Sequence, residues 1–595
     1  MIAVEQSARS MPGRMPGWMV VVAMLLALAK LVLVSHDEII SFGSDDWGFA
    51  ASAARWYWGN AYGPYAYTRG PTYALFVAAA GATGLPQRVV IELVWIAMSV
   101  VVMRGLRVCG VRPVLALGAY AIVLLDPLTL TLFNRLLADG LYTACFVAAV
   151  VAVSAALCAR ERRGLWGWSA VASVGAAVAA TARPEAVVVW MVLAGAAVAA
   201  GLVWWAGRRG AGAERGLSLR SRTVGAVVVP VIAAMALTHV YSYANLRRIG
   251  VYGMNDVLTP GFRALYRSLQ SIQPERGRLL VSVPRDVREK AYGLSPTFAK
   301  LREHLDGASP VPDGRIDCEL QTGVKGEYGA WMYWALRAAA WRVAVEENAG
   351  KGFASGAEME EFFAKAAREI DDGMRERGMG KRWVPVDFVP PEWRELGREV
   401  PRAVWRNCLR MGFRDVVKTA PETLPKEGER AFDGAALRRT ALVKLSRGES
   451  VAEAGWLSDG WVRRAERVQR GVGRVQNTLA PAAGVMMVGG LIAGVIGVRR
   501  LDARGRALLL CLLVCAGAIG VRLAFASMMD ATGVLFVRVV DANGGMSGAP
   551  EIGGPPMQLR YMFAVSALLG VVMVVGVEVI LAVLGSAAEP KRRVR

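Results

Sequence analysis

The residues best suited to chemistry lie at the ends of long apolar segments. Directly after the first apolar run, between Ser41 and Tyr73, the chain carries the adjacent carboxylates Asp45 and Asp46 and then Arg69. A carboxylate at a membrane edge is costly unless it meets a partner or a substrate. In a partly desolvated site its pKa rises toward neutrality, and it can then take a proton from an attacking hydroxyl. The pattern predicts an active-site loop; an ordinary interfacial anchor is the alternative.

The same loop is rich in tryptophan and tyrosine. Amphipathic rings suit the headgroup layer of a bilayer, where one side of the ring is apolar and the other is wet. We therefore expect the loop to lie along the outer membrane surface through its aromatic residues, which are Trp47, Trp56, Tyr57, Trp58, Tyr62, Tyr65 and Tyr67.

Charged residues recur at the ends of other apolar segments. Asp139 follows Arg135 by about one helical turn, Arg522 lies near the end of its segment, and Arg560 with Tyr561 opens the last one. The planar fork of arginine binds phosphate oxygens and stabilises charge that develops on a phosphate leaving group. An arginine inside a span, such as Arg522, tends to face a cavity or a partner. Together these residues suit a reaction at a lipid phosphate on one face of the membrane.

Each of these assignments has a structural alternative. Asp139 could instead cap the N-terminus of a helix, which is a common role of aspartate. The side chains of Arg69 and Arg560 could extend to lipid headgroups. For Arg183 and Glu185, which also follow an apolar segment, we expect a local ion pair.

The composition places these residues in a membrane protein. The chain has 595 residues, of which 54% are hydrophobic, and its net charge is +21. Apolar residues gathered into long runs indicate a polytopic membrane protein. The positive charge suggests nucleic acid at first sight, but lysine and arginine lie in short segments between the apolar runs, as cytoplasmic loops do. The sequence therefore argues against nucleic acid as a partner and for a lipid bilayer.

Ten apolar runs predict an all-α protein with about ten transmembrane helices. Arg9 and Arg14 precede the first run, so the N-terminus is expected in the cytoplasm and loop 35–73 outside. The short run Pro71–Leu85 reads as a re-entrant or interfacial helix. The alternation also puts the C-terminus in the cytoplasm, in the inner membrane of a bacterium. The runs are Trp18–Val34, Val89–Met103, Val114–Phe133, Leu141–Cys158, Trp166–Ala182, Ala186–Ala206, Val224–Tyr243, Leu479–Val498, Ala507–Ser527 and Leu559–Leu584.

Between the seventh and eighth spans lies a polar region, residues 246–478, which is too long for a simple connection and is expected to be an extracytoplasmic domain. It separates an N-terminal module, 1–245, from a three-span module, 479–595. Ser355 and Glu358 form a capping-box pattern ahead of an apolar face, so the domain reads as mainly helical. The stripe Trp331, Trp334, Ala338 and Trp341 predicts core packing, with a carbohydrate-stacking platform as the alternative.

Two further segments flank the C-terminal spans. The Arg-rich segment Gly448–Gln476 is expected to form a helix that lies on the membrane before the chain re-enters. The segment Met528–Pro556 is rich in glycine and is expected to be an outer loop.

Four elements of this chain occur in an order that is found in a known superfamily. An acid follows the first span, a basic residue-x-Pro element opens the next apolar segment, an Arg-plus-acid turn joins the third and fourth spans, and a basic-aromatic pair opens a late span. They are Asp45 or Asp46, Arg69-Gly70-Pro71, Arg135 with Asp139, and Arg560-Tyr561. With this set the chain resembles the GT-C superfamily of polyprenyl-phosphate-sugar glycosyltransferases, particularly the protein O-mannosyltransferase and lipid A aminoarabinose transferase branch. Domain 246–478 departs from that pattern.

The resemblance implies transfer of a sugar from a polyprenyl-phosphate donor to an extracytoplasmic acceptor, with inversion at the anomeric carbon. The acceptor would be a glycan, lipid or protein of the cell envelope. Asp45 or Asp46 would be the general base, with a slight preference for Asp45, and Asp139 would orient the acceptor or support a cation. Donor phosphate would be held by Arg69, Arg135, Arg522, Arg560 and Tyr561. Some members use a divalent metal and others do not, and two separated acids leave the metal undecided.

Two other classes of protein fit parts of the pattern. A transporter or flippase of lipid-linked sugars would carry charged residues deep in several spans, or broken helices near the midplane. In this sequence the charges lie mostly at span ends. A non-catalytic envelope scaffold would tolerate the joint loss of Asp45, Asp46 and Asp139.

Overall fold

The computed structural model is helical in all the regular elements that it describes. The description covers residues 15–34, 44–53, 55–64, 67–85, 87–133, 136–183, 185–207, 218–256, 259–275, 281–307, 326–328, 332–384, 393–413, 459–498, 501–542 and 555–588.

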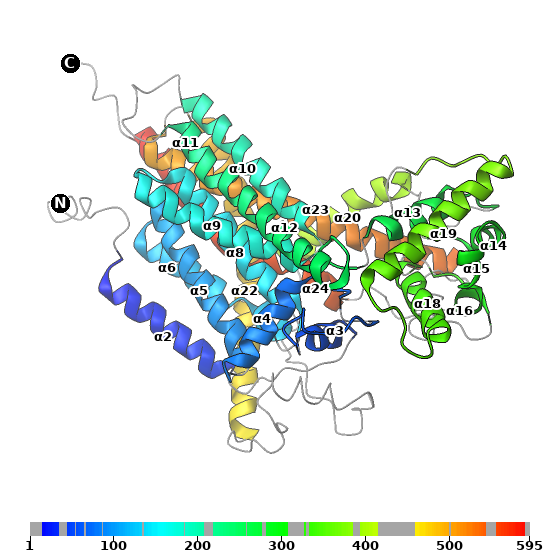
Figure 1. Ribbon diagram of the computed structural model, residues 1–595. Coiled ribbons are helices and arrows are strands. Elements are labelled where there is room, and N and C mark those ends of the chain that lie inside the picture. Colours follow the sequence, from blue (N-terminus) through cyan, green and yellow to red (C-terminus); the bar gives the residue numbers. More distant parts are fainter. Residues whose placement is uncertain are drawn as a thin grey trace.

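A bundle of long apolar helices forms the larger part of the protein (Figure 1). Within the described ranges, nine helices are long and apolar enough to cross a membrane, so the chain is a polytopic helical membrane protein. Its helices are α2 (Gly17–Leu33), α5 (Gln87–Val108), α6 (Pro113–Leu124), α7 (Pro127–Leu132), α8 (Ala138–Cys158), α9 (Arg162–Ala182), α10 (Ala186–Gly207), α11 (Leu219–Thr223), η2 (Val224–Val228), α12 (Val229–Ile249), α22 (Asp459–Gly497), α23 (Ala503–Ala542) and α24 (Pro555–Ala588).

Nine of the ten predicted runs correspond to these long helices. The first, Trp18–Val34, forms α2, which has 17 residues and is shorter than the others. The run Val114–Phe133 is divided into α6 and α7, because Asp126 caps α7 by accepting the Leu128 N–H at 2.9 Å.

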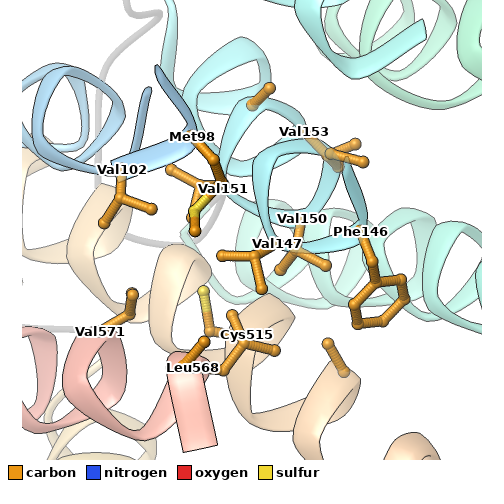
Figure 2. Close-up of a cluster of buried hydrophobic side chains, with 14 of the residues drawn as sticks. Met98, Val102, Phe146, Val147, Val150, Val151, Val153, Cys515, Leu568 and Val571 are labelled. Carbon is orange, nitrogen blue, oxygen red and sulfur yellow. The ribbon is translucent and has the colours of Figure 1, made fainter. Parts of the chain in front are cut away.

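Helix α8 lies at the centre of the bundle and is buried along nearly its whole length. It packs against α5 and α9 and also contacts α23 and α24. A Cβ placed on Gly175 of α9 would lie 2.6 Å from the Cys145 carbonyl oxygen, so only glycine allows these two helices to approach so closely. Figure 2 shows how side chains from four helices fill the centre; those labelled are Met98, Val102, Phe146, Val147, Val150, Val151, Val153, Cys515, Leu568 and Val571.

Two expectations about the C-terminal module were wrong. The segment Gly448–Gln476 was expected to lie on the membrane as a separate helix, but α22 begins at Asp459 and runs without a break into the apolar span. The segment Met528–Pro556 was expected to be an outer loop, but α23 stays helical to Ala542, and residues 543–554 lie outside the described residues. Both helices extend beyond the apolar runs that mark their spans, so the end of such a run does not mark the helix end.

A second buried core lies beyond one end of the bundle, where α13 to α19 stand together (Figure 1). Its elements are α13 (Pro260–Ser271), α14 (Arg285–Leu294), α15 (Pro296–Ala299), α16 (Arg302–Asp306), α18 (Met332–Glu347) and α19 (Gly356–Glu376). The predicted capping box is confirmed, because Ser355 accepts the Glu358 N–H and Glu358 accepts the Ala354 N–H at 2.7 Å. The predicted apolar face of α19 is buried in this core.

An arginine organises one end of this helical region. Arg288 donates to Asp306 through Nε and Nη2, at 2.9 and 2.7 Å, and to Glu327 through Nη1 at 3.1 Å. Tyr292 also donates to Asp306, at 2.6 Å. The Arg288 and Asp306 side chains are buried, so this is a paired and hydrogen-bonded charge group of the kind that a protein core tolerates.

Three further helices complete the fold. Helices α3 (Ser44–Ala53) and α4 (Pro71–Ala82) pack against each other at the end of the bundle that faces α18 (Figure 1). Helix α20 (Trp393–Phe413) packs against α22 and α23, and Asn407 donates to Ser527 of α23 at 2.9 Å.

Candidate active site at the end of the bundle

Asp45 and Asp46 lie in the first turn of α3. One helical turn later, the ring of Phe49 meets that of Tyr73 in α4 edge to face, with centroids 4.7 Å apart. The guanidinium of Arg69 lies 5.8 Å from the Phe49 ring centroid. Arg69 is thus held beside the helix that begins with the two predicted acids.

The loop between α3 and α4 owes its shape to buried aromatic residues. Trp56 and Tyr57 have φ angles of 53° and 63°, which residues other than glycine seldom adopt. The Tyr57 hydroxyl donates to the Arg69 carbonyl oxygen at 2.8 Å, and the Trp58 indole donates to Asn245 of α12 at 2.8 Å. These contacts fix the segment that ends at Arg69.

The expectation that these aromatics lie in the headgroup layer was wrong for two of them. Tyr57 and Tyr67 are fully buried, and Trp56 is exposed. Tyr57 and Tyr67 pack against each other with centroids 5.1 Å apart, and Tyr67 stacks on Tyr62. Burial inside the protein satisfies the same amphipathic rings that would suit an interface. Trp47 lies in α3, and Tyr65 lies outside the described residues.

The tryptophans of α18 contact this loop. The Arg69 guanidinium lies 5.6 Å from the ring centroid of Trp334, and the ring centroids of Trp341 and Tyr62 lie 5.9 Å apart. The predicted core packing of the stripe is confirmed in part, because Trp334 and Trp341 are half-buried and pack against the core. The fully buried face of α18 includes Met332, Leu336 and Val343. Trp331 lies outside the described residues.

Arg337 of α18 binds the loop from the same side. It donates to the carbonyl oxygens of Gly63 and Pro64 and pairs with Asp256 at 2.6 Å, and both charged side chains are buried. Tyr62 donates to the same carboxylate at 3.0 Å. Burial and the nearby Asp256 carboxylate both raise the pKa of Tyr62, so its hydroxyl stays protonated as a donor.

A second group of charges lies at the ends of three bundle helices. Asp139, in the first turn of α8, pairs with Arg183, the residue that ends α9. Arg183 also donates hydrogen bonds to Glu185 through Nε and Nη2, at 2.7 and 2.6 Å. Arg522 of α23 reaches Glu185 at 3.4 Å. We call Asp139, Arg183, Glu185 and Arg522 the charge cluster; it carries no net charge, and its side chains are at most 9% exposed.

The structure decides two of the alternatives that the sequence left open. Asp139 is not the helix cap, because Leu137 occupies that position and Asp139 follows it inside the helix. The local pair of Arg183 and Glu185 is confirmed, and it also joins Asp139 to Arg522. A carboxylate that accepts a guanidinium hydrogen bond is better suited to orient a ligand than to abstract a proton.

The Arg69 segment lies beside the end of α9. A Cβ placed on Gly70 would lie 3.3 Å from the carbonyl oxygen of Thr181, two residues before Arg183. Glycine therefore allows the chain that carries Arg69 to pass close to the chain that carries Arg183. The segment of Arg69 and Gly70 thus lies against α3 on one side and against the end of α9, next to the charge cluster, on the other.

The remaining predicted residues are placed less fully. Arg560 and Tyr561 lie near the start of α24, and Arg135 lies outside the described residues. In the part of the chain that the structure describes, no group of three or more histidine, cysteine, aspartate or glutamate side chains could hold a metal ion.

Sequence reasoning missed three contributors to this site: the bridging role of Arg183, the Trp334 ring over Arg69, and Tyr142. Tyr142 lies one turn after Asp139, which places both on the same face of α8 and offers a signal that could have found it. The Arg522 guanidinium lies 4.9 Å from the Tyr142 ring centroid.

Comparison with known proteins does not assign this site to a family. No protein-family model matches the chain, and no curated protein matches it.

Proposed function

We propose that this protein is a GT-C-type glycosyltransferase that moves a sugar from a polyprenyl-phosphate donor to an extracytoplasmic acceptor. The acceptor is a glycan, lipid or protein of the cell envelope. One observation carries the proposal. Arg69, Arg183 and Arg522, from three distant parts of the chain, lie with Asp139 and Glu185 around neighbouring helix ends, next to the helix of Asp45 and Asp46.

In the proposed reaction, an acceptor hydroxyl attacks the anomeric carbon of the donor sugar. Its proton passes to Asp45 or Asp46, and the bond between the anomeric carbon and the phosphate oxygen breaks, with the electron pair leaving on the phosphate. Attack from the face opposite the phosphate inverts the anomeric configuration. Arg69 and Arg522 stabilise the charge that develops on the leaving phosphate, and Asp139 orients the acceptor.

The proposal includes an orientation in the membrane. The protein lies in the cytoplasmic membrane of a bacterium with both termini inside, which puts residues 246–478 and the site outside. Arginine-rich segments between the apolar helices support this orientation, since short cytoplasmic loops carry such residues.

The first step of the test identifies the sugar-donor lipid. Lipid-linked sugars that copurify with the protein are identified by mass spectrometry, and release of free polyprenyl phosphate from them is then followed in nanodiscs. Replacing both Asp45 and Asp46 by Asn should abolish release while expression and membrane insertion stay normal. Asp371 and Asp372 in α19 are a second adjacent acid pair, and the same double substitution there should preserve turnover. Wild-type turnover without Asp45 and Asp46 would contradict the catalytic assignment.

A transporter of lipid-linked sugars is the second candidate, because the bundle contains further buried charges outside the charge cluster. Lys30 and Arg88 pair with Glu92 at 3.0 and 2.9 Å, and all three side chains are at most 2% exposed. Glu578 lies within the apolar segment Ala564–Gly585 of α24, where Arg504 reaches it at 3.0 Å. Transporters place such charges along their pathways. In liposomes, a transporter would move the copurified lipid between leaflets without releasing its carrier.

A further inference from the structure

The hydroxyl of Tyr142 is a buried polar group without an evident structural role. The side chain is 0% exposed, and its oxygen has no hydrogen-bond partner among the residues that the structure describes. A buried hydroxyl in that condition destabilises a fold, and most buried polar groups are paired. Tyr120 provides the contrast inside the same bundle, because its equally buried hydroxyl donates to the Ala23 carbonyl oxygen at 2.8 Å.

The Tyr142 side chain also lies next to the charge cluster. The Arg522 guanidinium lies over its ring, and the ring also stacks on that of Phe146, with centroids 5.7 Å apart and ring planes 10° from parallel. Asp139 lies one helical turn before Tyr142 on α8, and ion pairs through Arg183 and Glu185 join it to Arg522. The Tyr142 ring is therefore held against Arg522, beside the charge cluster.

The chemistry of these groups selects a kind of ligand. Guanidinium groups can only donate hydrogen bonds, and a protonated tyrosine hydroxyl can donate one as well. Arg183, Arg522 and Tyr142 thus share a preference for an oxygen that accepts, above all an anionic one. Because Asp139 and Glu185 already balance the two arginines, the hydroxyl adds a donor without adding charge.

We propose that the Tyr142 hydroxyl binds a phosphate oxygen of the polyprenyl-phosphate carrier. The proposal rests on the proposed function and names a residue within the same site. Tyr142 is a binding residue there: it donates a hydrogen bond to the phosphate next to Arg522, and its ring holds the Arg522 guanidinium in place through a cation–π contact.

Binding of farnesyl phosphate to the full-length protein in nanodiscs tests the proposal, with farnesol and inorganic phosphate as companion probes. Tyr142→Phe keeps the ring and removes only the hydroxyl. It should weaken farnesyl phosphate binding roughly ten- to hundredfold, since the lost hydrogen bond is to a charged group. Farnesol binding should not change. Tyr120→Phe, the matched control, should lower the melting temperature and leave binding of both lipids as in the wild type.

The outcomes separate the two proposals. Unchanged farnesyl phosphate binding in Tyr142→Phe, or an equal loss for farnesol, would overturn the role of the hydroxyl while leaving the transferase intact. Failure of the wild-type protein to bind farnesyl phosphate would remove both. Inorganic phosphate at the same concentrations should not displace farnesyl phosphate; displacement would assign the site to the free ion and overturn the assignment to a lipid.

Discussion

Arg183 and Asp139 form a buried ion pair that joins the end of α9 to the first turn of α8, across 44 residues of sequence. Arg183 also donates to Glu185 through Nε and Nη2, and Glu185 in turn meets Arg522. Taking such charges out of water is expensive, and it is repaid only by close geometry and complete pairing. The charge cluster therefore depends on its central arginine.

Arg183→Met should destabilise the bundle severely. The substitution leaves two buried carboxylates without their main partner, and breaking a buried pair in this way costs about 3–5 kcal/mol. Arg183→Lys keeps the charge but cannot grip Glu185 with two nitrogens, so its melting temperature should fall between those of the wild type and Arg183→Met. Thermal unfolding in nanodiscs measures all three. Equal melting temperatures for the Met variant and the wild type would show that the cluster does not hold the helices together.

Trp334→Ala should weaken binding of the lipid-linked phosphate while leaving the fold intact. The ring covers the Arg69 guanidinium from α18, and a partly desolvated cation–π contact contributes about 1–2 kcal/mol. Without it, Arg69 is less firmly positioned, and the dissociation constant of farnesyl phosphate should rise about fivefold or more. Trp383 is the control, because its side chain is 81% exposed and Trp383→Ala should leave binding unchanged. Similar losses in both variants would argue against a specific role for Trp334.

Arg337→Met should loosen the loop that precedes Arg69. Arg337 donates to the carbonyl oxygens of Gly63 and Pro64, and without it the buried Asp256 carboxylate keeps the Tyr62 hydrogen bond but loses its cation. Amide hydrogen exchange should then rise in peptides covering residues 55–70. Arg368→Met removes an exposed pair with Glu361 and should leave these peptides unchanged, since exposed pairs contribute little. Exchange at the wild-type rate in Arg337→Met would mean that the loop holds its shape without α18.

Much of the fold could be predicted because its signals are local. Apolar runs long enough to span a bilayer mark nine helices, and the pairing of Ser355 with Glu358 marks the start of α19. Each signal is complete within one continuous segment of the chain. Helix ends were harder to predict, as in α23, because a helix can continue beyond the apolar run that marks its span.

The candidate site was predicted only in part, because its contacts join distant segments. The sequence identified Asp139, Arg69 and Arg522 as charges at span ends, but not the residues that connect them. Tyr57 and Trp334 have rings that suit a headgroup layer or a protein core equally well, so their type does not decide where they lie. Which of these occurs depends on how α3, α4 and α18 pack together.

Acid should remove part of the stability of the helices α13 to α19 through Asp306. Burial by itself raises the pKa of this carboxyl, but hydrogen bonds from Arg288 and Tyr292 outweigh it, so its pKa in the folded protein lies below the usual value. The stabilisation is therefore complete above the unfolded pKa of about 3.9 and is lost as the pH falls through the lower folded pKa. The melting temperature of Asp306→Asn should lie well below that of the wild type at pH 7, and this gap in melting temperature should narrow below about pH 4. Glu361→Gln removes one partner of the exposed pair between Arg368 and Glu361, and its melting temperature should stay close to that of the wild type at every pH. Melting curves between pH 7 and pH 3 measure the gap; a gap that stays constant or widens in acid would show that the Asp306 carboxylate does not supply this stability.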